Sequence, residues 1–158
     1  MKRILSLLAA IVIVLTFSAC SAKKTPEQAA IRTKNVLSVL RQTGATYEKK
    51  DLDAFLSGVS NDLRDRDAFA KSVGAVFAKY DTIRFNIQYA KMVVLIEQKG
   101  EIKTTFTWNA EWLMAGGASV KDGGRITLVF EPENYKLISI DGKSPFLAQP
   151  GETPGSKQ

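Results

Sequence analysis

The sequence predicts an α+β domain in which three helices precede a run of antiparallel strands. Apolar residues recur with a period of about 3.6 residues as far as Asp81, and with a period of 2 beyond it. Short turn sequences separate the segments that have the strand period. Because the helices are segregated from the strands, we expect them to pack in the concave side of one strongly bent sheet.

The first helix is expected to begin at Pro26, after the capping residue Thr25, and to end near Lys49. Asp51 and Asp65 are placed to cap a short second helix and a longer third helix. The apolar faces of the three helices are marked by Val36, Leu37, Leu40 and Tyr47, by Leu52, Phe55, Leu56 and Val59, and by Phe69, Val73, Val76, Phe77 and Tyr80.

Five strand segments are expected after the helices. Residues 83–89 alternate apolar and polar, which is typical of a strand with one buried face. Residues 92–96 are apolar on both faces and therefore predict a central strand. A hairpin turn at 98–101 leads to a long strand that includes residues 105–112, a glycine-rich loop at 116–124, and two final strands at 126–130 and 135–140.

The N-terminal segment has the layout of a signal peptide. Lys2 and Arg3 precede sixteen residues, 4–19, that include only three polar side chains. A bilayer-spanning helix needs about 20 apolar residues, so this segment is short for a permanent span. We expect residues 1–19 to be a signal peptide, 20–25 a lipidated cysteine with a tether, 26–147 the folded domain, and 148–158 a disordered tail.

The residues around Cys20 resemble the lipobox of bacterial lipoproteins. Phe17-Ser18-Ala19-Cys20 supplies the small residues that precede the acylated cysteine, although Phe17 stands where leucine is usual. The resemblance implies that Cys20 receives a diacylglyceryl group before cleavage. Because Ser21 rather than aspartate follows Cys20, the resemblance also implies an outer-membrane address facing the periplasm. The alternative is a signal peptide cut elsewhere, or an uncleaved anchor, with Cys20 incidental.

Composition excludes several classes of function. The chain has no histidine and one cysteine, so it has no imidazole for proton transfer or metal binding and can form no internal disulfide. Its formal charge of +6 is scattered, without a basic stripe that contains aromatic residues, so we expect no nucleic-acid partner. We also expect no cofactor and no metal. Lys23 and Lys24 would favour anionic lipid headgroups beside the anchor.

The order of elements from 26 to 146 resembles the nuclear-transport-factor-2-like superfamily. The resemblance rests on Tyr47-Glu48-Lys49-Lys50-Asp51-Leu52-Asp53 at the end of the first helix, and on the closing pair 124–130 and 135–142. It implies a cone-shaped fold with an opening at one end. Some members of that superfamily, such as ketosteroid isomerase and the SnoaL-like cyclases, are enzymes, while others are binding modules. A cystatin-like sheet on one helix is the competing fold, but it needs fewer helices.

Six residues are candidates for a ligand-binding site. If the polar side of the long strand faced the cone, Glu111 could act as a base, with Asn109 beside it and Tyr47 or Tyr89 as a phenol donor. The alternation with tryptophans favours the opposite arrangement, in which Glu111 and Asn109 lie on the solvated face. Trp108 and Trp112 could line an apolar cavity or simply belong to the core.

The sequence alone therefore favours a membrane-anchored lipoprotein whose domain acts as a non-catalytic binding module. Its expected partners are membrane lipid through Cys20 and either an envelope protein or a small apolar ligand. A homodimer formed through the sheet is a further option. The alternative function is a small-molecule enzyme of the isomerase, cyclase or dehydratase type that uses a carboxylate or a tyrosine in the cone.

Overall fold

The computed structural model describes residues 26–97 and 99–147. The predicted signal peptide, the capping residue Thr25, Cys20 with its tether, and the predicted tail lie outside the described residues. In the part of the chain that is described, no helix combines the length and the apolar character needed to cross a bilayer.

Three helices precede the sheet, as predicted. They are α2 (Pro26–Glu48), α3 (Leu52–Ser57) and α4 (Arg66–Lys79). Asp51 caps α3 by accepting a hydrogen bond from the Ala54 N–H at 3.0 Å. Asp65 occupies the cap position of α4, but its backbone is left-handed, with φ of 56°, and its side chain makes no capping bond. The prediction that Asp65 caps α4 is therefore wrong, because a capping side chain acts from an extended backbone.

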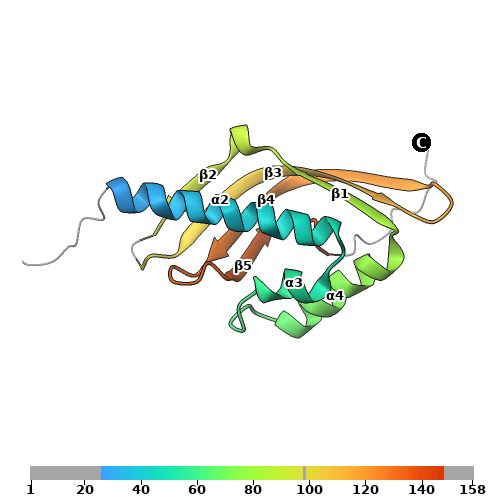
Figure 1. The fold of residues 1–158 in the computed structure, drawn as a ribbon, viewed down its shortest axis with the longest axis horizontal. Helices are drawn as coiled ribbons and strands as arrows, with labels where there is room; N and C mark the ends of the chain where they lie inside the picture. The colour runs from blue at the N-terminus through green and yellow to red at the C-terminus, as the bar shows by residue number, and fades with distance from the viewer. Residues whose placement is uncertain (1–25, 98, 148–158) are drawn as a thin grey trace, which may run out of the picture.

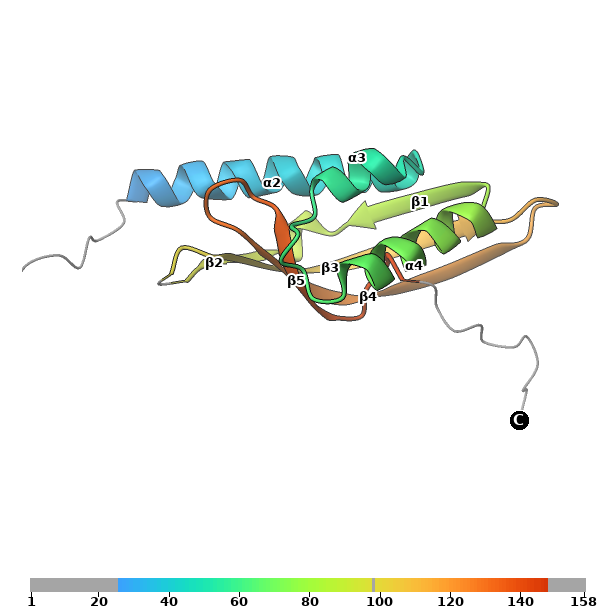
Figure 2. The same cartoon turned by 90° about the horizontal axis from the view of Figure 1, so that it is seen from below.

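The five strands form one antiparallel sheet. They are β1 (Thr82–Ile87), β2 (Val93–Ile96), β3 (Ile102–Leu113), β4 (Ser119–Phe130) and β5 (Leu137–Gly142). The order is β1-β3-β4-β5, and β2 also pairs with β3. The 3-10 turn η1 (Tyr89–Lys91) lets β1 and β2 line successive parts of the same edge of β3. The helices lie along this sheet, with α2 beside β1 and β2 and with α3 and α4 near one end of α2 (Figures 1 and 2).

Two strand predictions need correction. The segment predicted as a central strand is β2, which lies at the sheet edge with Val93 and Leu95 46% and 55% exposed. The predicted loop at 116–124 is mostly strand, since β4 begins at Ser119. Glycine is uncommon in strands, which is why this segment was predicted to be a loop. Here the glycines lie within a strand and allow other chain segments to approach it closely. A Cβ atom at Gly124 would lie 2.9 Å from the Lys143 side chain, and one at Gly123 would lie 2.7 Å from Asn109 Oδ1.

The core fills the concave side of the sheet. Along β3, the side chains of Phe106, Trp108 and Trp112 are buried, while the residues that alternate with them lie on the outer face. After β5 the chain turns at Gly142, and residues 143–147, here called the closing segment, fold back so that Phe146 is 1% exposed in the core. The interior of the cone is thus filled by aromatic side chains.

The turn at Gly142 gives a test of how the closing segment is placed. Gly142 has φ of +89°, and an added Cβ atom would lie 2.8 Å from the Arg125 carbonyl oxygen. Gly142→Ala is expected to reduce the free energy of unfolding by about 1–3 kcal/mol through backbone strain. Gly58→Ala is the matched control, because Gly58 has φ of −82° and its added Cβ would make an ordinary contact. Urea unfolding that shows equal losses in the two variants would contradict this account.

Candidate functional site

The hydroxyl group of Tyr47 is the polar centre of the cone interior. Tyr47 lies near the end of α2 and is fully buried. Its hydroxyl donates a hydrogen bond to the Pro145 carbonyl oxygen at 2.6 Å and accepts one from Trp112 Nε1 at 3.0 Å. Burial raises the pKa of Tyr47 well above its ordinary value, and the Trp112 hydrogen bond lowers it by less. The phenol is therefore a neutral hydrogen-bond donor in a dry environment.

Four phenylalanine rings surround the Tyr47 ring. They come from α3, α4, β1 and the closing segment, so four separate parts of the chain meet at one side chain. The ring centroids lie between 5.1 and 5.9 Å from that of Tyr47. Aromatic rings at these distances add to the stability gained from burial. The four are Phe55, Phe77, Phe85 and Phe146.

Polar contacts hold the closing segment against the concave face. Trp108 Nε1 donates to the Lys143 carbonyl oxygen at 2.8 Å, and the Lys143 N–H donates to the Arg125 carbonyl oxygen at 3.1 Å. The Lys143 ammonium group pairs with the Asp122 carboxylate at 2.5 Å. Asp122 pairs with the buried Ala110 in the sheet register, so both project on the concave side.

The Asp122 carboxyl group is held in its ionised form. Partial burial alone would raise the pKa of Asp122, but the hydrogen bonds from Lys143 and from the Gly123 N–H outweigh it, and the pKa lies below its ordinary value. The carboxylate is therefore ionised at neutral pH, and contact with Lys143 weakens it as a proton acceptor. Loss of that contact would leave a partly desolvated carboxylate, which is a stronger base.

The structure separates the six residues predicted for a binding site. Tyr47, Trp108 and Trp112 lie together in the aromatic interior, with 6.2 Å between the two indole rings. Tyr89 lies in η1, is 42% exposed, and has the Arg41 guanidinium over its ring. The remaining two, Asn109 and Glu111, lie on the outer face of the sheet.

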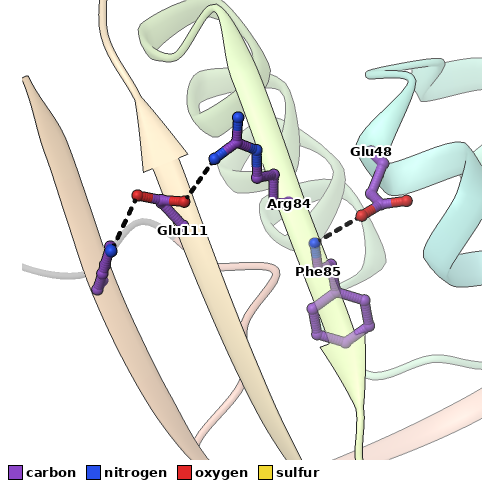
Figure 3. A network of polar contacts seen from close by, with 5 residues as sticks. Glu48, Arg84, Phe85 and Glu111 are labelled. Atoms are coloured by element: carbon purple, nitrogen blue, oxygen red, sulfur yellow. Dashed lines mark hydrogen bonds and ion pairs between the residues drawn. The ribbon is translucent and has the colours of Figure 1, made fainter. Parts of the chain in front are cut away.

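Glu111 belongs to a row of charges on the outer face. Its carboxylate accepts a hydrogen bond from Arg84 Nη1 at 2.9 Å and pairs with Lys121 Nζ at 3.3 Å (Figure 3). These partners, Arg84 first, hold the pKa of Glu111 below its ordinary value. The idea that Glu111 is a base inside the cone is therefore wrong, because strand alternation places it on the other side of the sheet. In the same view, Glu48 accepts a hydrogen bond from the Phe85 N–H, which joins α2 to the edge of β1.

A groove of about 620 Å³ lies beside these charges, and residues of both faces line it, including Glu111 from the outer face and Asp122 from the concave face. Its carboxylates and cations largely neutralise one another, so it has no strong preference for a charged ligand. Among the described residues, no group of three or more histidine, cysteine, aspartate or glutamate side chains is arranged to hold a metal ion.

The sequence did not predict the roles of two residues, Asp122 and Phe146, that reach the site from distant parts of the chain. Asp122 stood inside a predicted loop, where side-chain direction cannot be assigned. Phe146 followed the last predicted strand and was given no role. The available signal was the apolar pair Phe146-Leu147, which directly precedes the polar end of the chain.

Comparisons with known proteins bear on the fold. No family model and no curated protein matches the sequence. Among solved structures, the chain is similar to Aln2 from a Streptomyces species, with 15% identity, a TM-score of 0.52, and coverage of 75% of this chain and 91% of that one. It is also similar to a candidate aromatic ring hydroxylase from Novosphingobium aromaticivorans, with 12% identity, a TM-score of 0.55, and coverage of 75% and 96%.

A third similar structure is AusH from Aspergillus nidulans, with 10% identity, a TM-score of 0.51, and coverage of 68% of this chain and 81% of that one. At these identities the likeness concerns the fold. The fold is α+β of the nuclear-transport-factor-2-like type, with three helices on a bent antiparallel sheet, as the sequence predicted.

The expectation that the domain is not an enzyme needs correction. The structural neighbour with a TM-score of 0.55 is described as an aromatic ring hydroxylase candidate. Because a solved structure of this fold carries an enzyme description, the comparisons contradict the prediction that the domain is non-catalytic. They favour the alternative, a small-molecule enzyme, at the level of the scaffold.

The outer-face charges give a prediction about acid stability. Because the folded-state pKa of Glu111 lies below its ordinary value of 4.5, its ion pairs stabilise the fold fully above that value. This contribution is lost as the pH falls through the lower, folded-state pKa. Glu111→Gln is therefore expected to be less stable than the parent chain at pH 7 and equal to it at about pH 2, as measured by urea unfolding at both values. A stability difference that persists at the lower pH would contradict the assignment.

Proposed function

We propose that the domain is a small-molecule enzyme of the isomerase, cyclase or dehydratase type, and that its substrate is a cyclic or aromatic carbonyl compound. The catalytic candidates are the Tyr47 phenol and the Asp122 carboxylate. The second half of the proposal places this enzyme at a membrane through acylated Cys20, in the envelope of a bacterium.

The proposal rests on the groups of the closing segment that occupy the interior of the cone. The closing segment presents a carbonyl oxygen, that of Pro145, to the Tyr47 hydroxyl, and an aromatic ring, that of Phe146, to Phe55 and Phe85. These two groups have the chemistry of a ring-bearing carbonyl compound. The interior already accommodates a carbonyl oxygen and an aromatic ring of its own chain, and a free compound that carries both groups would make similar contacts if the closing segment moved away.

The proposed roles follow from the site's electrostatics. Tyr47 would donate its hydrogen bond to the substrate carbonyl oxygen and stabilise the negative charge that develops there as a proton leaves the neighbouring carbon. Trp112 Nε1 donates to the Tyr47 oxygen and would support charge on it. Because the surroundings are apolar rings, this hydrogen bond is stronger than it would be in water.

Asp122 would accept the proton from carbon. Lys143 belongs to the closing segment, so its ammonium group would leave Asp122 when that segment makes room for substrate. The carboxylate would then be more basic, and it would return the proton to a different carbon in an isomerisation, or pass it to a leaving hydroxyl in a dehydration. The carbon–hydrogen bond breaks to leave an enolate, and no oxidant or reductant is needed.

Hydrogen exchange at carbon tests the proposed chemistry. The full chain is expected to accelerate deuterium uptake from D₂O at the carbon beside the carbonyl of 2-tetralone or 2-indanone, measured by mass spectrometry. Tyr47→Phe is expected to lose roughly 100-fold or more of this acceleration, because the hydrogen bond to the developing oxyanion is missing. Asp122→Asn is expected to lose a comparable amount, because it cannot accept the proton.

The matched control is Glu111→Gln, which removes a carboxylate from the opposite face of the same sheet and should retain the exchange rate. Near-ultraviolet circular dichroism checks that each variant is folded, since Tyr47→Phe also leaves Trp112 Nε1 without its partner. If the parent chain exchanges these ketones no faster than buffer does, or if Glu111→Gln is as impaired as Tyr47→Phe, the proposed site is wrong.

The proposed anchor rests on the N-terminal sequence. Cys20 is the one cysteine in the chain, follows the two small residues Ser18 and Ala19, and ends an apolar segment. A single acyl chain binds membranes only marginally, whereas the two or three carried by a lipoprotein cysteine hold stably. Pro26, the first residue of α2, follows Cys20 closely in the sequence.

Cys20→Ala is expected to abolish incorporation of labelled palmitate and to release the chain from the membrane fraction. Acyl labelling and ultracentrifugation of cell extracts measure the two effects, and Ser21→Ala is the matched control that keeps both. Unchanged membrane association of the Cys20→Ala chain would remove the support for lipidation.

A further inference from the structure

The interior of the cone contains a second hydrogen-bond donor, to which the proposed reaction gives no role. Trp108 lies in β3 and is fully buried, and its Nε1 donates a hydrogen bond to the Lys143 carbonyl oxygen at 2.8 Å. The Tyr47 hydroxyl donates in the same way to the Pro145 carbonyl oxygen. Two donors of the interior are thus satisfied by two carbonyl groups of the closing segment.

The indole of Trp108 is held in place by elements other than the closing segment. The sheet register pairs Trp108 with Ile87 of β1 on one side and with Gly124 of β4 on the other. Its ring centroid lies 6.4 Å from that of Phe85 and 6.2 Å from that of Trp112. Because strands and packed rings fix the indole, we expect its N–H group to keep its position when the closing segment moves away.

Gly124 keeps space open beside this indole. A Cβ atom at Gly124 would lie 2.9 Å from the Lys143 side chain, so a larger residue there would collide with the closing segment. Gly124 is also the register partner of Trp108. A compound that replaces the closing segment would therefore find room next to Trp108 Nε1.

The buried N–H group of Trp108 would discriminate between compounds. When the closing segment moves away, Trp108 Nε1 loses the Lys143 carbonyl oxygen. A compound with one carbonyl group would satisfy Tyr47 and leave the indole N–H unpaired, whereas a compound with two acceptor oxygens would satisfy both. A site built around a buried donor rejects analogues that lack the matching acceptor for this reason. Trp112 Nε1 makes no such demand, since its acceptor is the Tyr47 oxygen.

We propose that Trp108 is a specificity-determining residue, and that the substrate carries a second acceptor oxygen that receives the hydrogen bond of Trp108 Nε1. The inference rests on the proposed function. It narrows the substrate from a ring-bearing carbonyl compound to one that has two acceptor oxygens, of which the first binds the Tyr47 hydroxyl.

The covalent structure of the closing segment indicates how these groups are spaced. Five chain atoms join the carbonyl carbons of Lys143 and Pro145, which can lie at most about 7 Å apart. Three atoms join the Pro145 carbonyl carbon to the Phe146 ring. The compound 11-phenylundecane-2,8-dione copies both spacings. Its analogue 1-phenylundecan-4-one lacks only the oxygen that Trp108 would bind.

Isothermal titration calorimetry of the full chain with these two compounds tests the proposal. The parent chain is expected to bind the dione roughly 10- to 100-fold more tightly than the monoketone. Burial of apolar surface alone would favour the monoketone, because it is the more apolar of the two. Trp108→Phe is expected to remove the preference for the dione. Trp112→Phe is the matched control, since it removes an indole N–H group from the same strand and should keep the preference.

Equal affinity of the parent chain for the two compounds would overturn the role of Trp108, and this result requires no variant to fold. A preference that persists in Trp108→Phe, with folding checked by near-ultraviolet circular dichroism, would overturn it as well. If the parent chain binds neither compound, the proposal fails together with the interior site on which it rests. A preference for the dione without acceleration of deuterium uptake would support the site with two acceptor oxygens, while the proposed reaction would fail separately.

Discussion

The hydrogen-bonded phenol of Tyr47 is the interaction on which the arrangement of the domain depends. It joins the end of α2 to β3 through Trp112 and to the closing segment through Pro145. A buried hydroxyl without partners would cost about 1–3 kcal/mol, so the two bonds require all three elements to be in place together. The four phenylalanine rings around it come from segments as distant as α3 and the closing segment. Their packing against Tyr47 also requires these segments to be in place together.

The same constraint connects stability with the proposed chemistry. The groups that complete the core, the Pro145 carbonyl and the Phe146 ring, are also those that a carbonyl substrate would replace. Lys143, which belongs to the same segment, holds Asp122 in its less basic state. A single displacement of the closing segment would therefore open the interior and activate the carboxylate together.

The sequence predicted the fold through features that are local. Periods of 3.6 and 2 depend on neighbouring residues, and they located the three helices and most strands. They wrongly placed β2 in the centre of the sheet, because its residues are apolar on both faces. Which strands lie beside β2 depends on pairing with residues far away in the sequence, and no local pattern reports that pairing. The candidate site was predicted only in part for the same reason. Alternation along β3 correctly placed Trp108 and Trp112 inside the domain. The roles of Asp122 and Phe146 depend on a chain reversal at Gly142, which no local pattern indicates.

The position of the closing segment also affects when the domain can fold. Phe146 fills the middle of the core, yet it lies near the C-terminal end of the described chain. A ribosome releases this residue only after all the described helices and strands have been synthesised, so the nascent chain lacks a central part of its interior until then. Because long-range contacts of this kind form slowly, the chain is expected to reach its packed state only after these segments are complete, and to stay unfolded for longer than a chain whose core is built from local contacts.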